Sequence, residues 1–160
     1  MNCPNCGAPL KLAAGNTSLR CDYCKLVVAV ESDDTGVQFL DEAPEMTCPT
    51  CQAGLWHGVL ASVEVDTCKT DRGLLVPMDW FEPLVEKMRG LHSEREYPGP
   101  VDDSELERKI MCPKCHQKMD THYYFGGGHA VMSTCERCEL HWLDGGMLMR
   151  IVRAPRIAEE

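Results

Sequence analysis

The chain has 160 residues and a formal net charge of −9, and no apolar run in it is long enough to cross a bilayer as a helix. The negative charge argues against nucleic acid as the main partner, because binding to phosphates draws its affinity from Lys and Arg side chains. The N-terminal sequence MNCPNCGAPLKL lacks the apolar segment of a secretory signal. We therefore expect a reducing, cytoplasmic compartment and no membrane partner.

Eleven cysteines dominate the sequence, and ten of them form five C-x2-C pairs. Two such pairs on tight turns supply the four sulfurs of a tetrahedral zinc site. The eleventh cysteine, Cys68, begins a sixth pair whose second position is Asp71. Because the cysteine count is odd and no secretory signal is visible, the spacing favours a metal over a disulfide framework. Zn2+ is the default ion, although a four-sulfur site of the rubredoxin type also holds iron.

Read in chain order, the pairs make two complete ligand sets and a third set that contains an aspartate. The predicted metal ligands are Cys3, Cys6, Cys21 and Cys24, then Cys48, Cys51, Cys68 and Asp71, and finally Cys112, Cys115, Cys135 and Cys138. Each set spans only about 25 to 45 residues, too few to be stable on an apolar core, so each is predicted to fold around its own ion. The predicted fold is small, β-rich and metal-stabilised: three tandem zinc ribbons made of β-hairpins or three-stranded sheets.

Composition divides the chain into these ribbons and the segments between them. Residues 32–46, for example, carry five acidic and no basic side chains. The predicted units are zinc ribbon 1 at 1–31, an acidic linker at 32–46, zinc ribbon 2 with a helix at 47–91, a linker at 92–110, zinc ribbon 3 with a short helix at 111–152, and a tail at 153–160.

Several shorter elements follow from local patterns. The acidic linker has a candidate strand at 37–40, and the run 58–68 alternates well enough for a strand. A helix is expected from Pro77 to Gly90, with Trp80, Leu84 and Met88 on its buried face.

The later segments show three further signals. The segment 104–107 matches a capping box, so we expect a short helix that leads into ribbon 3. Asp144 is the expected N-cap of a final short helix. The glycines at 126–128 form a hairpin tip that is the best candidate for a partner contact.

The second and third ribbons are repeats of each other, and each places an apolar stretch and a helix after its second pair. In ribbon 3 the pattern CPxC…CxxC-x-x-x-W-L-D-G-G resembles the transcription factor IIB-like zinc ribbon family of small bacterial proteins. The resemblance covers about residues 46–90 and 111–152, and in ribbon 2 Leu75 and Asp71 replace the tryptophan and the fourth cysteine. It implies a fold and a metal but no particular partner. Ribbon 1 looks like a generic four-cysteine ribbon.

The ligand sets allow more than one chemistry. In each of the two complete sets, four thiolates fill the coordination shell of the ion. Such a set stabilises the fold, or it acts as a redox switch if oxidation ejects the metal. In the second set Asp71 completes the site, His57 or His92 supplies a nitrogen ligand instead, or no metal is bound. A catalytic metal would need an open position, a base and a cleft, and the sequence shows no such constellation.

The sequence therefore predicts a non-enzymatic zinc protein that acts as a protein-interaction scaffold or adaptor. One alternative is a transcription-linked or nucleic-acid-binding ribbon protein, which the resemblance favours and the charge opposes. A second alternative is a metal- or redox-responsive protein that uses the three-cysteine, one-aspartate site. The sequence specifies neither the protein partner nor the oligomeric state.

Overall fold

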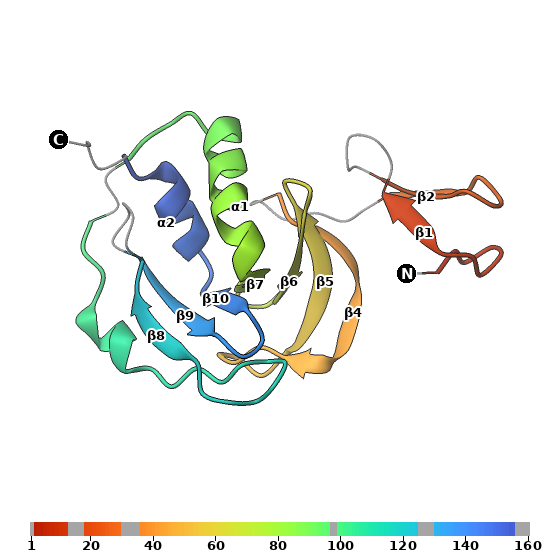
Figure 1. Ribbon diagram of the computed structural model, residues 1–160. Coiled ribbons are helices and arrows are strands. Elements are labelled where there is room, and N and C mark those ends of the chain that lie inside the picture. Colours follow the sequence, from red (N-terminus) through yellow and green to blue (C-terminus); the bar gives the residue numbers. More distant parts are fainter. Residues whose placement is uncertain (1, 13–17, 30–35, 97–98, 125–129, 156–160) are drawn as a thin grey trace.

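A computed structural model describes residues 2–12, 18–29, 36–96, 99–124 and 130–155 of the chain (Figure 1). Within these ranges the protein is small and β-rich with few helices, as the sequence predicted. Its strands form two sheets, one with the order β1-β2-β3 and one with the order β4-β5-β6-β7-β10-β9-β8. We call residues 2–29 the N-terminal module, residues 48–91 the middle module and residues 112–153 the C-terminal module.

The three-stranded sheet belongs to the N-terminal module and lies apart from the rest of the protein in Figure 1. It consists of β1 (Leu10–Leu12), β2 (Ser18–Cys21) and β3 (Val27–Ala29), joined in antiparallel pairs. Among its described residues, the buried apolar side chains are Cys3, Leu19 and Cys21. Burying one leucine contributes only about 2 kcal/mol. This sheet therefore has too little apolar burial to be stable without a cross-link.

The seven-stranded sheet joins the middle and C-terminal modules, where the sequence predicted two separate ribbons. The middle module supplies β5 (Gly54–Leu60), β6 (Val63–Thr67) and β7 (Leu74–Pro77), and the C-terminal module supplies β8 (Asp120–Tyr123), β9 (Val131–Cys135) and β10 (Leu140–Leu143). The join is an antiparallel pairing of β7 with β10. Leu74, Leu75 and Val76 are all buried, so β7 is apolar on both faces. Such a strand needs a neighbour on each side, because an exposed apolar edge invites aggregation.

The two modules are related by a pseudo-twofold axis at this join. Leu75 follows Cys68 by seven residues and Trp142 follows Cys135 by seven residues, so the two occupy equivalent places in the repeat. These equivalent residues are direct partners across β7 and β10. Each strand is followed by a helix on the same face of the sheet (Figure 1). The sequence repeat thus folds as an internal pseudo-dimer.

The second half of the predicted acidic linker is a strand. β4 (Gln38–Thr47) pairs with β5 at the edge of the large sheet, so the expected linker at 32–46 is wrong from residue 38 onward, and the candidate strand at 37–40 is too short. Val37, Phe39 and Ala43 are buried, whereas Glu42 and Glu45 remain exposed. The register shifts twice along this pair. These irregularities break the period-two pattern that would have revealed a strand.

The two helices cover one face of the large sheet and pack against each other (Figure 1). α1 (Met78–Leu91) buries Phe81, Leu84, Val85 and Met88, and α2 (Met147–Arg153) buries Leu148, Ile151 and Val152. Together with buried side chains of the sheet they form one apolar core. Arg89 of α1 donates a hydrogen bond to the Ile151 carbonyl in the last turn of α2, at 3.0 Å.

Two helix predictions need correction. Trp80 is 52% exposed, because the face of α1 that meets the sheet contains Phe81 and its neighbours at i+3, i+4 and i+7. Asp144 does not cap α2. Its N-cap is Gly146, at a φ of 88° that suits glycine, and the Asp144 side chain binds elsewhere.

The linker at 92–110 contains the expected short helix as a 3-10 turn, η1 (Asp103–Glu107). Its cap is Asp102, whose carboxylate accepts a hydrogen bond from the Ser104 amide, in place of the predicted capping box. The glycine tip at 126–128 lies outside the described residues. Among the helices that the structure describes, none is long and apolar enough to span a bilayer.

Replacing a tryptophan by alanine should affect stability more at the join between the modules than on the exposed face of α1. Trp142 is 1% exposed and lies in a buried cluster that contains Leu75 and cysteines of both modules. Trp142→Ala should lower the free energy of unfolding of the metal-loaded protein by about 3–5 kcal/mol, because it empties a packed site. Trp80→Ala is the matched control and should cost less than about 1 kcal/mol. Urea denaturation measures both, and equal losses would contradict the assigned packing.

Candidate metal centres

Six turns of one backbone conformation position the ligand side chains; we call each a knuckle. Each begins at a cysteine and has a positive φ four residues later, at Gly7, Lys25, Gln52, Arg72, His116 and Glu139. In the first five of these turns the residue with positive φ donates its amide hydrogen to the carbonyl of the first cysteine, at 2.8–3.0 Å. Five of the six residues are not glycine, and each costs about 1 kcal/mol in this conformation. A strained turn persists only when its surroundings hold it in place, which points to a group bound at the centre of the knuckles.

The knuckles meet in pairs and bring together the twelve residues that the sequence singled out. In each of the three sets the ligand atoms lie within 4.8 Å of one another. Two complete sets of four cysteines occur, one in the N-terminal and one in the C-terminal module. Together with the set that contains Asp71, the described residues form three groups that could hold a metal ion.

The sulfur spacing fits metal coordination and not disulfides. Cys3 and Cys24 have their Sγ atoms 3.5 Å apart, and Cys115 and Cys135 have theirs 3.6 Å apart. A disulfide needs about 2.05 Å. Four sulfurs at about 2.3 Å from a tetrahedral ion lie about 3.8 Å from each other. All eleven cysteines are free thiols.

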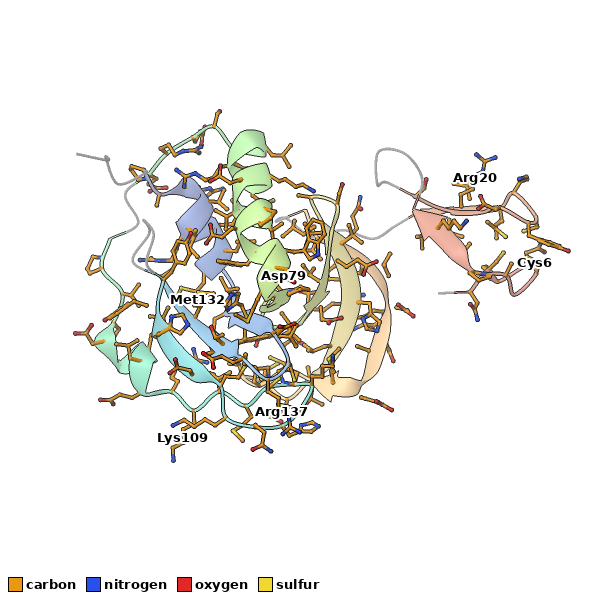
Figure 2. The ribbon with its side chains drawn as sticks, viewed as in Figure 1. Cys6, Arg20, Asp79, Lys109, Met132 and Arg137 are labelled. Carbon is orange, nitrogen blue, oxygen red and sulfur yellow. The ribbon has the colours of Figure 1, made fainter. Side chains whose placement is uncertain are left out.

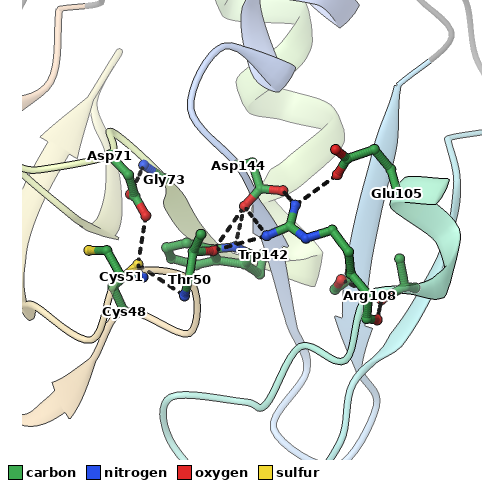
Figure 3. Close-up of polar contacts among 11 residues, drawn as sticks. Cys48, Thr50, Cys51, Asp71, Gly73, Glu105, Arg108, Trp142 and Asp144 are labelled. Atoms are coloured by element: carbon green, nitrogen blue, oxygen red, sulfur yellow. Dashed lines mark hydrogen bonds and ion pairs between the residues drawn. The ribbon is translucent and has the colours of Figure 1, made fainter. Parts of the chain in front are cut away.

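The third set, in the middle module, places Asp71 on a complete knuckle. The Arg72 amide donates to the Cys68 carbonyl at 2.8 Å, as in the four-cysteine sets, and the Asp71 amide lies 3.5 Å from the Cys68 sulfur. The carboxylate is oriented by the Gly73 amide, which donates to Oδ1 at 2.9 Å (Figure 3). The other oxygen, Oδ2, accepts a hydrogen bond from the Cys48 thiol at 2.9 Å. Asp71 thus presents one carboxylate oxygen, Oδ2, to the three sulfurs, and zinc accepts a ligand set of three sulfurs and one oxygen.

The two histidines considered as fourth ligands lie elsewhere. His57 is on β5, where its Nδ1 lies 2.5 Å from Oδ1 of Asp66. His92 follows the last residue of α1 and caps that helix through its backbone amide. Neither belongs to the group formed by the three cysteines and Asp71.

The thiols in these sets differ in acidity, because some are buried and others accept hydrogen bonds. Burial raises the pKa of Cys48 and Cys112. Hydrogen bonds from Asn5 and the backbone lower the pKa of Cys24 to about 6. At Asp71 burial opposes ionisation, yet hydrogen bonds from the Cys48 thiol and from a backbone amide hold the pKa of the carboxyl below its usual range. Without a cation, each set therefore keeps protons on some of its sulfurs, and a divalent ion would displace them.

The middle set is braced by residues of the C-terminal module. A Cβ added at Gly73 would lie 2.2 Å from the Trp142 ring, so the ring packs directly on the backbone behind Asp71. A Cβ added at Gly145 would lie 2.1 Å from the Asp71 carbonyl oxygen. Both contacts need glycine, and the second lies in the W-L-D-G-G segment. The backbone around Asp71 is therefore fixed by the partner half of the pseudo-dimer.

A polar network also connects the C-terminal module with the first knuckle of the middle module (Figure 3). The Asp144 Oδ1 accepts hydrogen bonds from the Thr50 hydroxyl at 3.1 Å and from the Trp142 indole at 3.2 Å. Arg108 forms an ion pair with Asp144 and donates to Glu105 Oε2 at 2.8 Å. Sequence reasoning missed Arg108 because it lies in the segment that was expected to be a linker. The only local signal was the Asp that follows Trp-Leu.

No protein-family model, no curated protein and no solved structure matches the chain. The resemblance to the transcription factor IIB-like zinc ribbon family therefore stays a prediction. The assignment of metal ligands depends on the geometry of the knuckles.

The position of Asp71 predicts which substitution empties the middle set. Asp71→Ala should remove one ion per chain under mild chelation, because three thiolates leave the fourth position to water. His57→Ala is the control and should leave metal content unchanged. Elemental analysis under reducing conditions measures both, and Asp71→Cys should slow metal release.

Two outcomes would contradict this assignment. If Asp71→Ala has no effect and His57→Ala lowers the metal content, the fourth ligand is the histidine. If neither substitution changes the content and the unmodified chain holds only two ions, the middle set binds no metal.

Proposed function

We propose that the chain is a zinc-binding protein built from three tandem zinc ribbons, the second and third fused, that serves as a scaffold for recognition of another protein. The observation that carries this proposal is the convergence of twelve ligands into three sets on six equivalent knuckles. Knuckles of this kind hold a tetrahedral ion between two hairpins, and that is the function of structural zinc.

The ligand chemistry favours zinc over iron. Zn2+ takes thiolate, imidazole and carboxylate ligands in any tetrahedral combination. Iron in small thiolate sites prefers sulfur from every position. The set formed by three cysteines and Asp71 mixes sulfur with oxygen, so it supports zinc, and the two four-cysteine sets have the same knuckle geometry.

A structural role for these ions supports a non-enzymatic function. In each complete set, four thiolates fill the coordination shell and leave no position for water or substrate. The spacing of the sulfurs fits metal ligation and not disulfides, which supports a reducing compartment such as the cytoplasm.

Charge supports a protein partner over nucleic acid. The formal net charge of −9 rises further in magnitude when zinc binds, because Zn2+ with four thiolates carries about −2. Affinity for nucleic acid depends on the number of phosphates that Lys and Arg neutralise.

A nucleic-acid-binding role is the second candidate, and one feature of the N-terminal module favours it. Lys11, Arg20 and Val27 are exposed and lie side by side across β1, β2 and β3. Tyr23, on the second knuckle of that module, is 85% exposed. Lys11 also pairs with Asp22 at 3.0 Å, so Arg20 is the basic side chain of this row that the ion pair leaves for a phosphate. Exposed aromatic and basic side chains on one small sheet are the groups that single-stranded nucleic acids contact.

One comparison separates these two functions. The zinc-loaded chain should retain a protein partner from its own cell extract, and both chelation and Cys112→Ser should abolish retention, because the interacting surface depends on the metal-held fold. Binding to single-stranded or duplex nucleic acid at physiological salt should be weaker than about micromolar. Fluorescence anisotropy with labelled oligonucleotides measures it. Submicromolar binding that Arg20→Ala abolishes would instead establish the second candidate.

A further inference from the structure

A groove lies where the start of α1 meets the second knuckle of the C-terminal module. The Met78 amide donates to the Glu139 carbonyl at 2.9 Å, and both residues line the groove. The groove has a volume of about 550 Å³ and is lined from β6, from the first turn of α1 and from both knuckles of the C-terminal module. Figure 2 labels Asp79 at this end of α1. This volume is in the range of sites that hold a side chain or a small ligand.

The indole of Trp80 forms one wall of this groove. It is 52% exposed, although burial would stabilise the fold more than exposure does. The ring already attracts an ammonium group, since Lys87 Nζ lies 6.0 Å from its centroid. Tryptophan is the aromatic side chain that binds cations most strongly through its face.

The charged groups around the indole select a cation. Glu64, Asp79 and Glu139 line the groove and are exposed, and Lys114 is the one basic residue among its lining side chains. Cys138, a ligand of the C-terminal set, lines it as well. With zinc bound, that set contributes a further charge of about −2. The groove therefore combines three exposed carboxylates with a half-exposed aromatic ring, from which a bound cation would displace the Lys87 ammonium group.

We propose that this groove binds a lysine or arginine side chain from a basic segment of a protein partner. The inference deepens the proposed scaffold function and depends on it for the identity of the partner as a protein. A guanidinium or ammonium group would stack on Trp80 and pair with the carboxylates of Glu64 and Asp79. A nucleic acid does not fit, because its phosphates would face three carboxylates. A metal ion does not fit either, because these carboxylates are not among the groups of convergent ligands that the described residues form.

Binding of a defined peptide to the zinc-loaded full chain tests the proposal. The probe is a short labelled peptide of arginines separated by glycine and serine, and its matched control carries citrulline, which has the same shape without the charge, in place of arginine. Anisotropy should show saturable binding of the arginine peptide only. NMR should place the shift changes at the Trp80 indole and at residues 62–64 and 139.

Substitutions distinguish peptide binding in the groove from nonspecific electrostatic attraction to an acidic protein. Trp80→Ala and Glu64→Gln should each raise the dissociation constant of the arginine peptide by at least about threefold. Both side chains are exposed or half-exposed, so the fold should persist, and Glu64→Gln still tests the groove if Trp80→Ala disturbs α1. Glu107→Gln is the control, because it removes the same charge from an exposed position outside the groove.

Three results would overturn the proposal: no saturable binding at millimolar peptide, equal weakening by Glu107→Gln, or shift changes confined to another part of the chain. Failure here is distinguishable from failure of the scaffold function. Partner retention that still depends on zinc would then show that the partner docks elsewhere. Peptide binding in a chain that retains no zinc-dependent partner would show a cation site without the scaffold role.

Discussion

The convergence of four ligands within 4.8 Å at each of three sites is the constraint on which the rest of the structure depends. Thiols at such short range cannot all ionise without a cation between them, and the knuckles that carry them hold five non-glycine residues at positive φ. A divalent ion would remove both difficulties, since it would neutralise the thiolates and fix the turns. The N-terminal module depends on this most directly, because its described residues bury so few apolar side chains.

The middle and C-terminal modules combine this constraint with a shared sheet. Pairing of β7 with β10 places Leu75 against Trp142 on a pseudo-twofold axis and merges the apolar residues of two small units into common clusters. The middle set gains a rigid frame from this arrangement, because the Trp142 ring packs on Gly73 and Asp144 holds Thr50. We infer that this frame lets the middle module tolerate a carboxylate where its repeat has a fourth cysteine. An isolated ribbon would have no second support for a weaker ligand set.

The ligand residues were predictable because a knuckle is local: two cysteines three positions apart determine the turn, whatever surrounds them. The pairing of β7 with β10 was not predictable in that way, since it joins residues far apart in the sequence. Its only clue was that Leu74, Leu75 and Val76 are apolar on both faces, a pattern that a strand at an exposed edge would not show. β4 escaped prediction because its acidic composition and register shifts hide the alternation. Trp80 was assigned to the core because helical spacing alone does not show which of two adjacent faces meets the sheet.

The shared sheet implies that the middle and C-terminal modules form one cooperative body, whereas the N-terminal module folds by itself. Amide hydrogen exchange by NMR on Cys138→Ser in the presence of zinc tests it most directly. We expect lost protection in β5 to β7 as well as in β8 to β10, because the two modules share their sheet and apolar clusters, and we expect β1 to β3 to be unchanged. Loss of protection confined to β8, β9 and β10 would contradict the claim and would show independent ribbons.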